Sequence, residues 1–234
     1  MGLDRVITKK VGKRYGTERA LAEVTLELRA GSMCALLGHN GAGKTTLLGI
    51  LSTLVRQSHG EVAYFAGDTQ LEGVAVRREI GMLAHASLCY GELSATENLE
   101  LTAGLYELEG VDPKAELDRV GLEPKARERA SRTYSRGMAQ RLALARALMT
   151  KPSLILLDEP FTGLDREGAM ALGSQLGTLR ASGAIVIVVT PDLEAIAGRA
   201  DHVAVLRRGK LVFDERGSDY SYEQLKDIYH RQAN

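Results

Sequence analysis

The chain has 234 residues, with 30 basic and 30 acidic side chains and therefore no formal net charge. This length predicts one large domain or a domain with a subdomain, and the charge balance favours neither nucleic acid nor a membrane surface as a partner. The two cysteines, Cys34 and Cys89, form no disulfide framework and indicate a reducing compartment; the longest apolar run, Ala184 to Val189, is too short to span a bilayer, so we expect a soluble chain.

The first predicted elements are two strands, each with one buried face, over Val6 to Val11 and Val24 to Leu28. Met1 to Arg5, ahead of them, contains no apolar secretory signal. Tyr15 lies between the strands, beside a turn at Gly16. A tyrosine in such a place is commonly a packing residue; the functional alternative is an aromatic face stacked on a purine.

A glycine-rich loop follows the apolar strand Met33 to Leu37 and precedes apolar residues at helical spacing up to Leu54. Its pattern, G-x-x-x-x-G-K-T, is that of a phosphate-binding loop in the strand–loop–helix context that the motif requires. The loop residues are Gly38, His39, Asn40, Gly41, Ala42, Gly43, Lys44, Thr45 and Thr46. The glycines and the helix N-terminus direct N–H groups at an anion, Lys44 adds a charge for the outer phosphates, and Thr45 can ligate Mg²⁺. We predict that the chain binds a nucleoside triphosphate.

The middle third predicts a helical insert between two α/β parts. An apolar strand, Ile80 to Ala84, ends at His85, and the apolar period then changes. Ser94 and Glu97 match a capping box at the start of one helix, and Pro113 occupies a first-turn position of a second helix.

Two carboxylates follow this insert at the end of a strand. The turn Ser135-Arg136-Gly137 opens an alanine- and leucine-rich helix that ends before Pro152, and the next strand, Leu154 to Leu157, runs into Asp158 and Glu159. An apolar run without alternation is typical of a parallel sheet covered on both faces, and such sheets bind ligands at their carboxyl edge. Because consecutive strand side chains point opposite ways, one acid can approach a metal while the other faces a water.

The C-terminal part again alternates helices and strands. Gly163-Leu164-Asp165 precedes a helix, and the apolar strand Ile185 to Val189 ends at Thr190-Pro191-Asp192. Arg207 to Lys210 predicts the turn of a hairpin, and Tyr222 to Gln232 predicts an amphipathic terminal helix.

In this order and spacing, the phosphate loop, the serine–glycine turn and the acidic strand end resemble the ATPase subunit of ATP-binding cassette (ABC) transporters over nearly the whole chain. The turn departs from the family's signature motif, which has a second glycine where Arg136 stands and usually glutamine where Met138 stands. The resemblance implies a P-loop NTPase fold of the α/β class, with a mostly parallel sheet, an N-terminal antiparallel β portion and an inserted α-helical subdomain. It implies one ABC ATPase domain over residues 1–234: a nucleotide-binding core at 1–87 and 152–215, a helical signature subdomain at 88–151, and a C-terminal helix at 216–234.

The resemblance also implies a role for each motif residue. Gly38 to Thr46 would hold the phosphates of ATP, with Lys44 as their charged partner. Asp158 would support Mg²⁺ together with the loop threonine, Glu159 would polarise the attacking water, and Tyr15 would stack on adenine.

A second anion site is implied at Ser135 and Gly137, where backbone N–H groups and a helix N-terminus point outward. In this architecture the turn of one chain does not reach its own phosphate loop, so the family forms head-to-tail dimers with two ATP molecules between the chains. Asp165 would belong to the loop that crosses this dimer. The sequence leaves open whether the dimer is a homodimer or a heterodimer with another ABC ATPase.

Two positions depart from the family. His85 stands where glutamine usually ends the strand before the insert; it is a candidate metal ligand, and a packing histidine is the alternative. Pro191 stands where a histidine usually holds the terminal phosphate, and proline has neither a side-chain donor nor an N–H. Loss of one positioned polar group predicts hydrolysis slower by roughly 10²–10³.

The leading hypothesis is an ATP-hydrolysing subunit at the cytoplasmic face of the inner membrane that energises a separate membrane permease, with a permease helix in a cleft at His85 and Ala86. Leu93 to Leu99, His85 and Asp158 to Asp165 resemble the haem-exporter ATPases of cytochrome c maturation. The alternative is a hydrolysis-deficient, ATP-gated dimerisation module or the regulatory half of a heterodimeric transporter, which Pro191 favours. A soluble ABC protein of translation or DNA repair is disfavoured, since the chain lacks a second cassette and a coiled coil, and we expect no nucleic acid partner.

Overall fold

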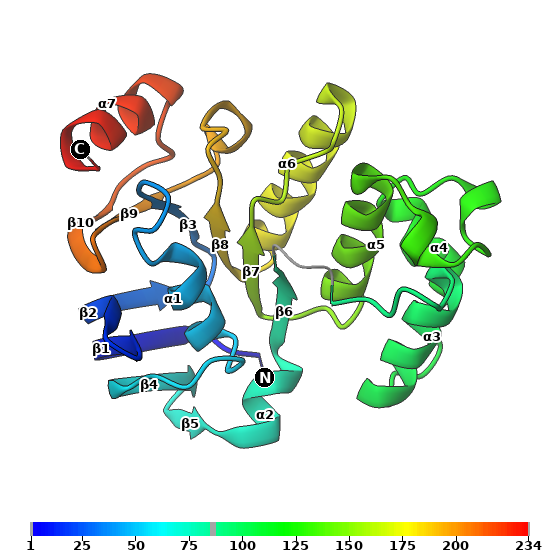
Figure 1. The fold of residues 1–234 in the computed structure, drawn as a ribbon, viewed down its shortest axis with the longest axis horizontal. Helices are drawn as coiled ribbons and strands as arrows, with labels where there is room; N and C mark the ends of the chain where they lie inside the picture. Colours follow the sequence, from blue (N-terminus) through cyan, green and yellow to red (C-terminus); the bar gives the residue numbers. More distant parts are fainter. Residues whose placement is uncertain (1, 85–87, 234) are drawn as a thin grey trace.

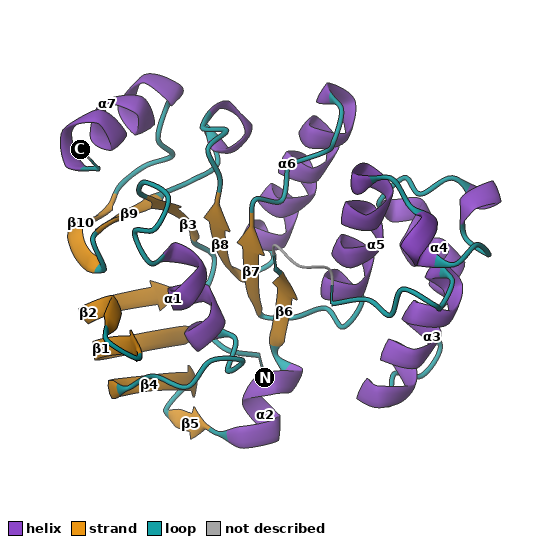
Figure 2. Ribbon diagram, viewed as in Figure 1, coloured by secondary structure: helices purple, strands orange, loops and turns teal. Residues whose placement is uncertain are grey.

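The computed structural model describes residues 2–84 and 88–233, and its strands form two sheets. The first is antiparallel, in the order β2-β1-β4-β5. Its strands are β1 (Arg5–Tyr15), β2 (Glu18–Arg29), β4 (His59–Ala66) and β5 (Thr69–Leu71). The second has six strands in the order β10-β9-β3-β8-β7-β6, parallel except for β10 (Figure 2). Its strands are β3 (Met33–Leu37), β6 (Ile80–Leu83), β7 (Leu154–Asp158), β8 (Ile185–Val189), β9 (His202–Arg207) and β10 (Lys210–Arg216).

The predicted α/β class, with a mostly parallel sheet and an antiparallel β portion, is confirmed. The antiparallel sheet is not built from the N-terminal strands alone, because β4 and β5 follow the phosphate loop in the chain and pair with β1 and with each other. Their place in this sheet depends on long-range pairing, which the local strand pattern does not contain.

The helices lie close to where the sequence predicts them. They are α1 (Lys44–Leu51), α2 (Gly73–Arg78), α3 (Ala95–Tyr106), α4 (Pro113–Arg119), α5 (Arg136–Leu148), α6 (Arg166–Ala181) and α7 (Tyr222–Gln232), with short 3-10 helices at η1 (Pro124–Ala126), η2 (Ser131–Thr133) and η3 (Glu194–Ile196). The predicted capping box of Ser94 and Glu97 is present, and Pro113 begins α4. The expectation that the helix after the loop extends to Leu54 is wrong. Helix α1 ends at Leu51, Thr53 adopts a left-handed φ of 64°, and Leu54 is 62% exposed.

The strands of the parallel sheet have two buried faces, as their unbroken apolar runs predict. In β3, Cys34 and Leu36 belong to the core shared with α1 and the antiparallel sheet, whereas Met33, Ala35 and Leu37 belong to the core shared with α5, α6 and α7. Figure 1 shows α1 on the side of the antiparallel sheet and α6 on the other side. The carboxyl end of β3 therefore delivers the loop before α1 to the edge where β7 and β8 also end.

Helices α3, α4 and α5 form a separate group, at the right of Figure 1. Their own apolar cluster includes Leu99 of α3, Leu117 of α4 and Leu142 of α5. The opposite face of α5 packs on the parallel sheet through Ala143 and Leu144. Helix α5 thus joins this helical group to the core and fixes the position of the turn at its N-terminus.

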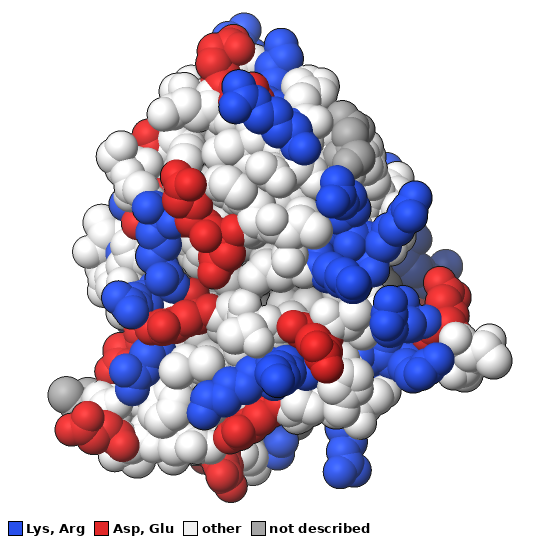
Figure 3. Space-filling model, turned by 90° about the vertical axis from the view of Figure 1, so that its left-hand side faces the viewer, with Lys and Arg blue, Asp and Glu red and all other residues white. Residues whose placement is uncertain are grey.

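The surface has charges of both signs on the face formed by the antiparallel sheet, β10 and α7. Figure 3 shows basic and acidic side chains interspersed there, in keeping with equal totals of 30 each. No helix among residues 2–84 and 88–233 combines the length and apolar character needed to cross a membrane.

Candidate functional site

The glycine-rich loop lies between β3 and α1, and its shape requires glycine at two closely packed positions. Gly38 has φ 144° and Gly43 has φ 103°. A Cβ on Gly43 would lie 2.6 Å from the carbonyl oxygen of Ala20, and one on Gly38 would overlap the carbonyl of Leu206. Neighbouring backbone therefore surrounds the loop closely, and only glycine fits.

The remaining loop residues differ in exposure. His39, Asn40 and Gly41 are exposed at its rim. Ala42 is buried, and its carbonyl accepts a hydrogen bond from the N–H of Gly209 at 3.0 Å. This contact ties the loop to the β9–β10 turn. Thr46, like Lys44 and Thr45, belongs to the first turn of α1.

Lys44 folds back over the loop. Its Nζ donates hydrogen bonds to the carbonyl oxygens of Gly38 at 2.6 Å and His39 at 2.9 Å. Burial lowers the pKa of Lys44, while the carboxylates of Asp158 and Glu159 act in the opposite direction and favour its charged form. The ammonium group is thus positioned before any phosphate arrives.

Thr45 and Asp158 meet, although they are 113 residues apart in the chain. The Thr45 hydroxyl donates to Asp158 Oδ2 at 2.7 Å, and Asp158 is the last residue of β7, only 5% exposed. Hydroxyl and carboxylate oxygens are suitable ligands for Mg²⁺, which takes its other ligands from phosphates and water. Within residues 2–84 and 88–233 no three His, Cys, Asp or Glu side chains form a metal-binding group. The predicted metal ligand His85 lies outside the described residues.

Glu159 leaves the strand in an unusual conformation. Its φ is 53°, in the left-handed region that a non-glycine residue rarely adopts. Its N–H donates to the carbonyl of Val189 at 2.7 Å, and Gln140 Nε2 donates to its carbonyl oxygen at 3.2 Å. These contacts from β8 and α5 fix the backbone, and the two carboxylates have different partners, Thr45 for Asp158 and Thr162 for Glu159.

The Glu159 carboxylate is left accessible. Thr162 Oγ1 donates to Oε2 at 3.3 Å, and Glu159 lines a pocket of about 150 Å³ together with Lys44, Pro191 and Tyr229. At this strand end, Asp158 thus accepts a hydrogen bond from the loop threonine, and Glu159 lines the pocket that Lys44 also lines.

The serine–glycine turn packs against the loop before α6. Ser135 is the N-cap of α5 and accepts a hydrogen bond from the N–H of Met138 at 3.3 Å, and it is exposed. Asp165 caps α6, accepts from the N–H of Gly168 at 2.8 Å, and lies 3.6 Å from Arg141 Nη2. A helix N-terminus that faces solvent in this way is available to an anion on another chain.

Gly137 is expected to be intolerant of any side chain. A Cβ there would overlap the carbonyl oxygen of Gly163, so Gly137→Ala should lower the free energy of unfolding by about 1–3 kcal/mol. Gly177→Ala is the matched control, because open space surrounds that position in α6, and it should raise stability by about 0.5–1 kcal/mol. Urea unfolding measures both; equal midpoints for Gly137→Ala and the wild type would contradict the close contact.

Two tyrosines bear on the site: Tyr15, which the sequence singles out, and Tyr229, which lines the pocket with Lys44. Tyr15 is 50% exposed, and Lys13 Nζ lies over its ring, 4.9 Å from the centroid. Its contact with adenine stays a prediction. Tyr229 and Gln140 were not among the candidate site residues selected from the sequence. The only available signal for Tyr229 was its place on the apolar side of the terminal helix, at helical spacing from Leu225.

Comparisons with known proteins agree with this geometry. A family model described as ABC transporter matches residues 21–162. The chain is 36% identical over 215 residues to the daunorubicin resistance ATP-binding protein DrrA3 of Streptomyces coeruleorubidus, covering 90% of this chain and 68% of that protein. It is 35% identical over 234 residues to the phosphonates import ATP-binding protein PhnC of Anaeromyxobacter dehalogenans, covering 93% of this chain and 47% of that protein. The dimeric structure of the ATP-binding cassette MJ0796 in a post-hydrolysis state, bound to ADP and Pi, superimposes with a TM-score of 0.80 at 28% identity, covering 90% of this chain and 98% of that one.

Proposed function

This chain belongs to the ABC transporter ATPase family, and from that premise we propose that it hydrolyses ATP to energise a separate membrane permease. The observation that supports this most is the hydrogen bond between Thr45 and Asp158, 2.7 Å long, beside a pocket lined by Lys44 and Glu159. It unites the phosphate loop, a Mg²⁺ position and a candidate base within one site.

The reaction is phosphoryl transfer to water, in which the protein mainly positions groups and stabilises charge. Lys44 would contact the outer phosphates, and the backbone N–H groups of the loop would hold the others. Mg²⁺, when bound by Thr45 and Asp158, would neutralise charge on the phosphates. Glu159 would accept a hydrogen bond from the attacking water, for which its accessible carboxylate is suited.

We propose a head-to-tail dimer in which Ser135 and Gly137 of one chain face the ATP held by the loop of the other. The exposed N-terminus of α5 supports this, and so does the dimeric state of the similar MJ0796 cassette. Asp165, at the adjacent N-cap of α6, would lie at the same interface. Each chain of the dimer would be one ABC ATPase domain. It would consist of the core at 1–87 and 152–215, the helical subdomain at 88–151 and the C-terminal helix at 216–234.

The permease would contact the helical side of the molecule at the cytoplasmic face of the inner membrane. The cleft predicted at His85 and Ala86 lies outside the described residues; on the helical side, Tyr90 and Leu105 are 61% and 69% exposed. The relatives' names include both a resistance protein and an import protein, so they do not select a substrate. The motifs at Leu93–Leu99 and Asp158–Asp165 support a haem exporter as the finer proposal.

A second candidate function rests on Pro191. This residue borders the Glu159 pocket and supplies neither a side-chain donor nor an N–H. In this alternative, ATP binding closes a dimer and a different cassette carries out hydrolysis.

Steady-state phosphate release with MgATP distinguishes hydrolysis by this chain from ATP-gated dimerisation without hydrolysis. Glu159→Gln serves as the blank. We expect release by the wild type clearly above the blank, and a further gain of no more than about tenfold for Pro191→His, which adds a donor on that side of the pocket. Release equal to the blank, restored by Pro191→His, would instead support the ATP-gated module.

A further inference from the structure

Helix α7 lies against the phosphate loop, beside the segment that joins β3 to α1 (Figure 1). The hydroxyl of Tyr229 is 3.2 Å from His39 Nδ1, and the two rings meet edge to face with centroids 5.5 Å apart. These residues are 190 positions apart in the chain. The terminal helix therefore brings an aromatic hydroxyl to the rim of the nucleotide site.

Tyr229 lines the same pocket of about 150 Å³ as Lys44, Glu159 and Pro191. Lys44 and Glu159 identify this pocket as the end of the site where the terminal phosphate and the attacking water belong. Pro191 offers no donor on its side of the pocket. The phenol of Tyr229 can accept a hydrogen bond and donate one at the same time.

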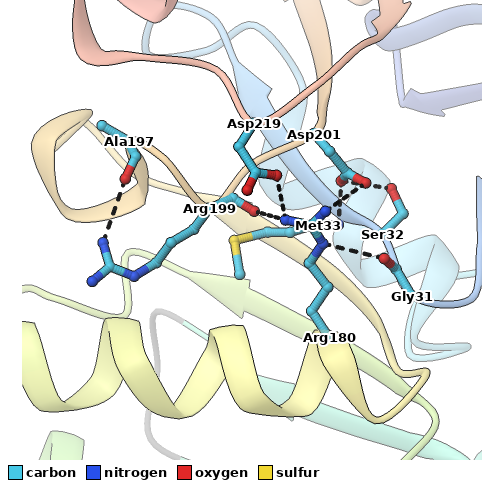
Figure 4. A network of polar contacts seen from close by, with 8 residues as sticks. All are labelled: Gly31, Ser32, Met33, Arg180, Ala197, Arg199, Asp201 and Asp219. Carbon is cyan, nitrogen blue, oxygen red and sulfur yellow. Dashed lines mark hydrogen bonds and ion pairs between the residues drawn. The ribbon is translucent and has the colours of Figure 1, made fainter.

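The position of α7 is built into the fold by a polar network that precedes it (Figure 4). Arg180 at the end of α6 contacts Asp219 at 2.6 Å and Asp201 at 3.1 Å, and Asp201 accepts from the N–H of Met33 at 2.8 Å. The network thus links the segment before α7 to the first residue of β3, the strand that leads into the phosphate loop.

The helix itself is fixed by a cap and by its buried face. Ser221 and Gln224 form a capping box, and Leu225 is fully buried in the core beneath α7. Ile228 and Tyr229 are half-buried against that core. A side chain held in this way loses little rotamer freedom when it meets a ligand.

We propose that Tyr229 donates a hydrogen bond to the terminal phosphate of bound ATP while its oxygen accepts one from His39, and that it supplies the donor that Pro191 does not. The inference rests on the proposed function, because it assumes that ATP occupies the loop. Tyr229 then distinguishes ATP from ADP, since ADP has no phosphate at that end of the site.

Tyr229→Phe tests this by removing one oxygen atom. In a Glu159→Gln background, where ATP is not consumed, equilibrium titration with ATP and with ADP is the measurement. We expect the Kd for ATP to rise about tenfold or more, as for loss of a hydrogen bond to a charged group, and the Kd for ADP to stay within about twofold. Tyr222→Phe is the matched control: it is on the same helix, 41% exposed, with its ring near Lys226, and should change neither value.

Hydrolysis gives a second readout. In the otherwise wild-type chain, Tyr229→Phe should lower kcat about tenfold or more, and adding Pro191→His should bring kcat to within about threefold of Pro191→His alone, because the two donors serve one place. An unchanged Kd for ATP in Tyr229→Phe would overturn the inference. An equal rise in the Kd for ATP and for ADP would also overturn it, because it would mean that Tyr229 only maintains the shape of the loop. If the wild type releases no phosphate, the proposed hydrolysis is contradicted, whereas the comparison of Kd values still tests the role of Tyr229. If the chain does not bind ATP, the proposed function and the role of Tyr229 are both overturned.

Discussion

Glu159→Gln is expected to lower kcat for ATP hydrolysis by about 10²–10⁴, with the Kd for ATP changed by no more than about threefold. Glutamine has nearly the same shape as glutamate, and its amide oxygen can still accept the hydrogen bond from Thr162. The backbone of residue 159 is held through its own N–H and carbonyl, which the substitution leaves in place. Only the capacity to accept a proton from water is lost.

Phosphate release and nucleotide titration on the same preparation separate these two effects. Glu61→Gln is a suitable control, because Glu61 is exposed on β4 in the antiparallel sheet. Comparable rates for Glu159→Gln and Glu61→Gln would show that the attacking water is activated elsewhere.

The same variant tests the head-to-tail dimer. When hydrolysis is blocked, ATP should persist between the loop of one chain and the turn at Ser135 of the other, so light scattering should report a dimer in ATP and Mg²⁺ and a monomer in ADP. A Glu159→Gln protein that stays monomeric in ATP would contradict the proposed second anion site.

The sequence was most informative where a few neighbouring residues determine a structure. Ser94 and Glu97 cap α3 as predicted, and the terminal helix spans Tyr222 to Gln232 as predicted. Both signals consist of side chains three or four residues apart, which interact whatever the rest of the fold does. The phosphate loop belongs to the same class, because its glycine spacing and its flanking elements are local.

The sequence was least informative about which local units meet. That β4 pairs with β1, and that Gly137 packs against Gly163, depends on the whole arrangement of the chain. The apolar spacing of Tyr222 to Gln232 predicts an amphipathic helix, but spacing alone does not say that Tyr229 of this helix meets His39. The left-handed backbone at Glu159 was equally hidden, because contacts from β8 and α5 stabilise it.

Removal of the Lys44 ammonium is expected to lower kcat/KM for ATP by about 10³. Lys44→Met removes two contributions. One is a hydrogen bond to a charged phosphate, about 1.5–3 kcal/mol of binding free energy, and the other is a positioned charge that stabilises the transition state. Methionine keeps the apolar part of the side chain, and the carbonyls of Gly38 and His39 that lose their donor lie near the open rim of the loop. The melting temperature should therefore change by only a few degrees.

Lys210→Met is the control for Lys44→Met. It shows whether the loss of kcat/KM comes from the positioned ammonium of Lys44 or from the loss of any positive charge near the site. Lys210 is the exposed first residue of β10, and the neighbouring Gly209 hydrogen-bonds to the loop residue Ala42. Its loss removes one charge close to the site without touching the phosphate cradle, so kcat/KM should fall by no more than about twofold at physiological salt, where exposed charges are screened. Similar losses in both variants would mean that attraction to the surface, not the ammonium folded over Gly38, determines how this chain holds its nucleotide.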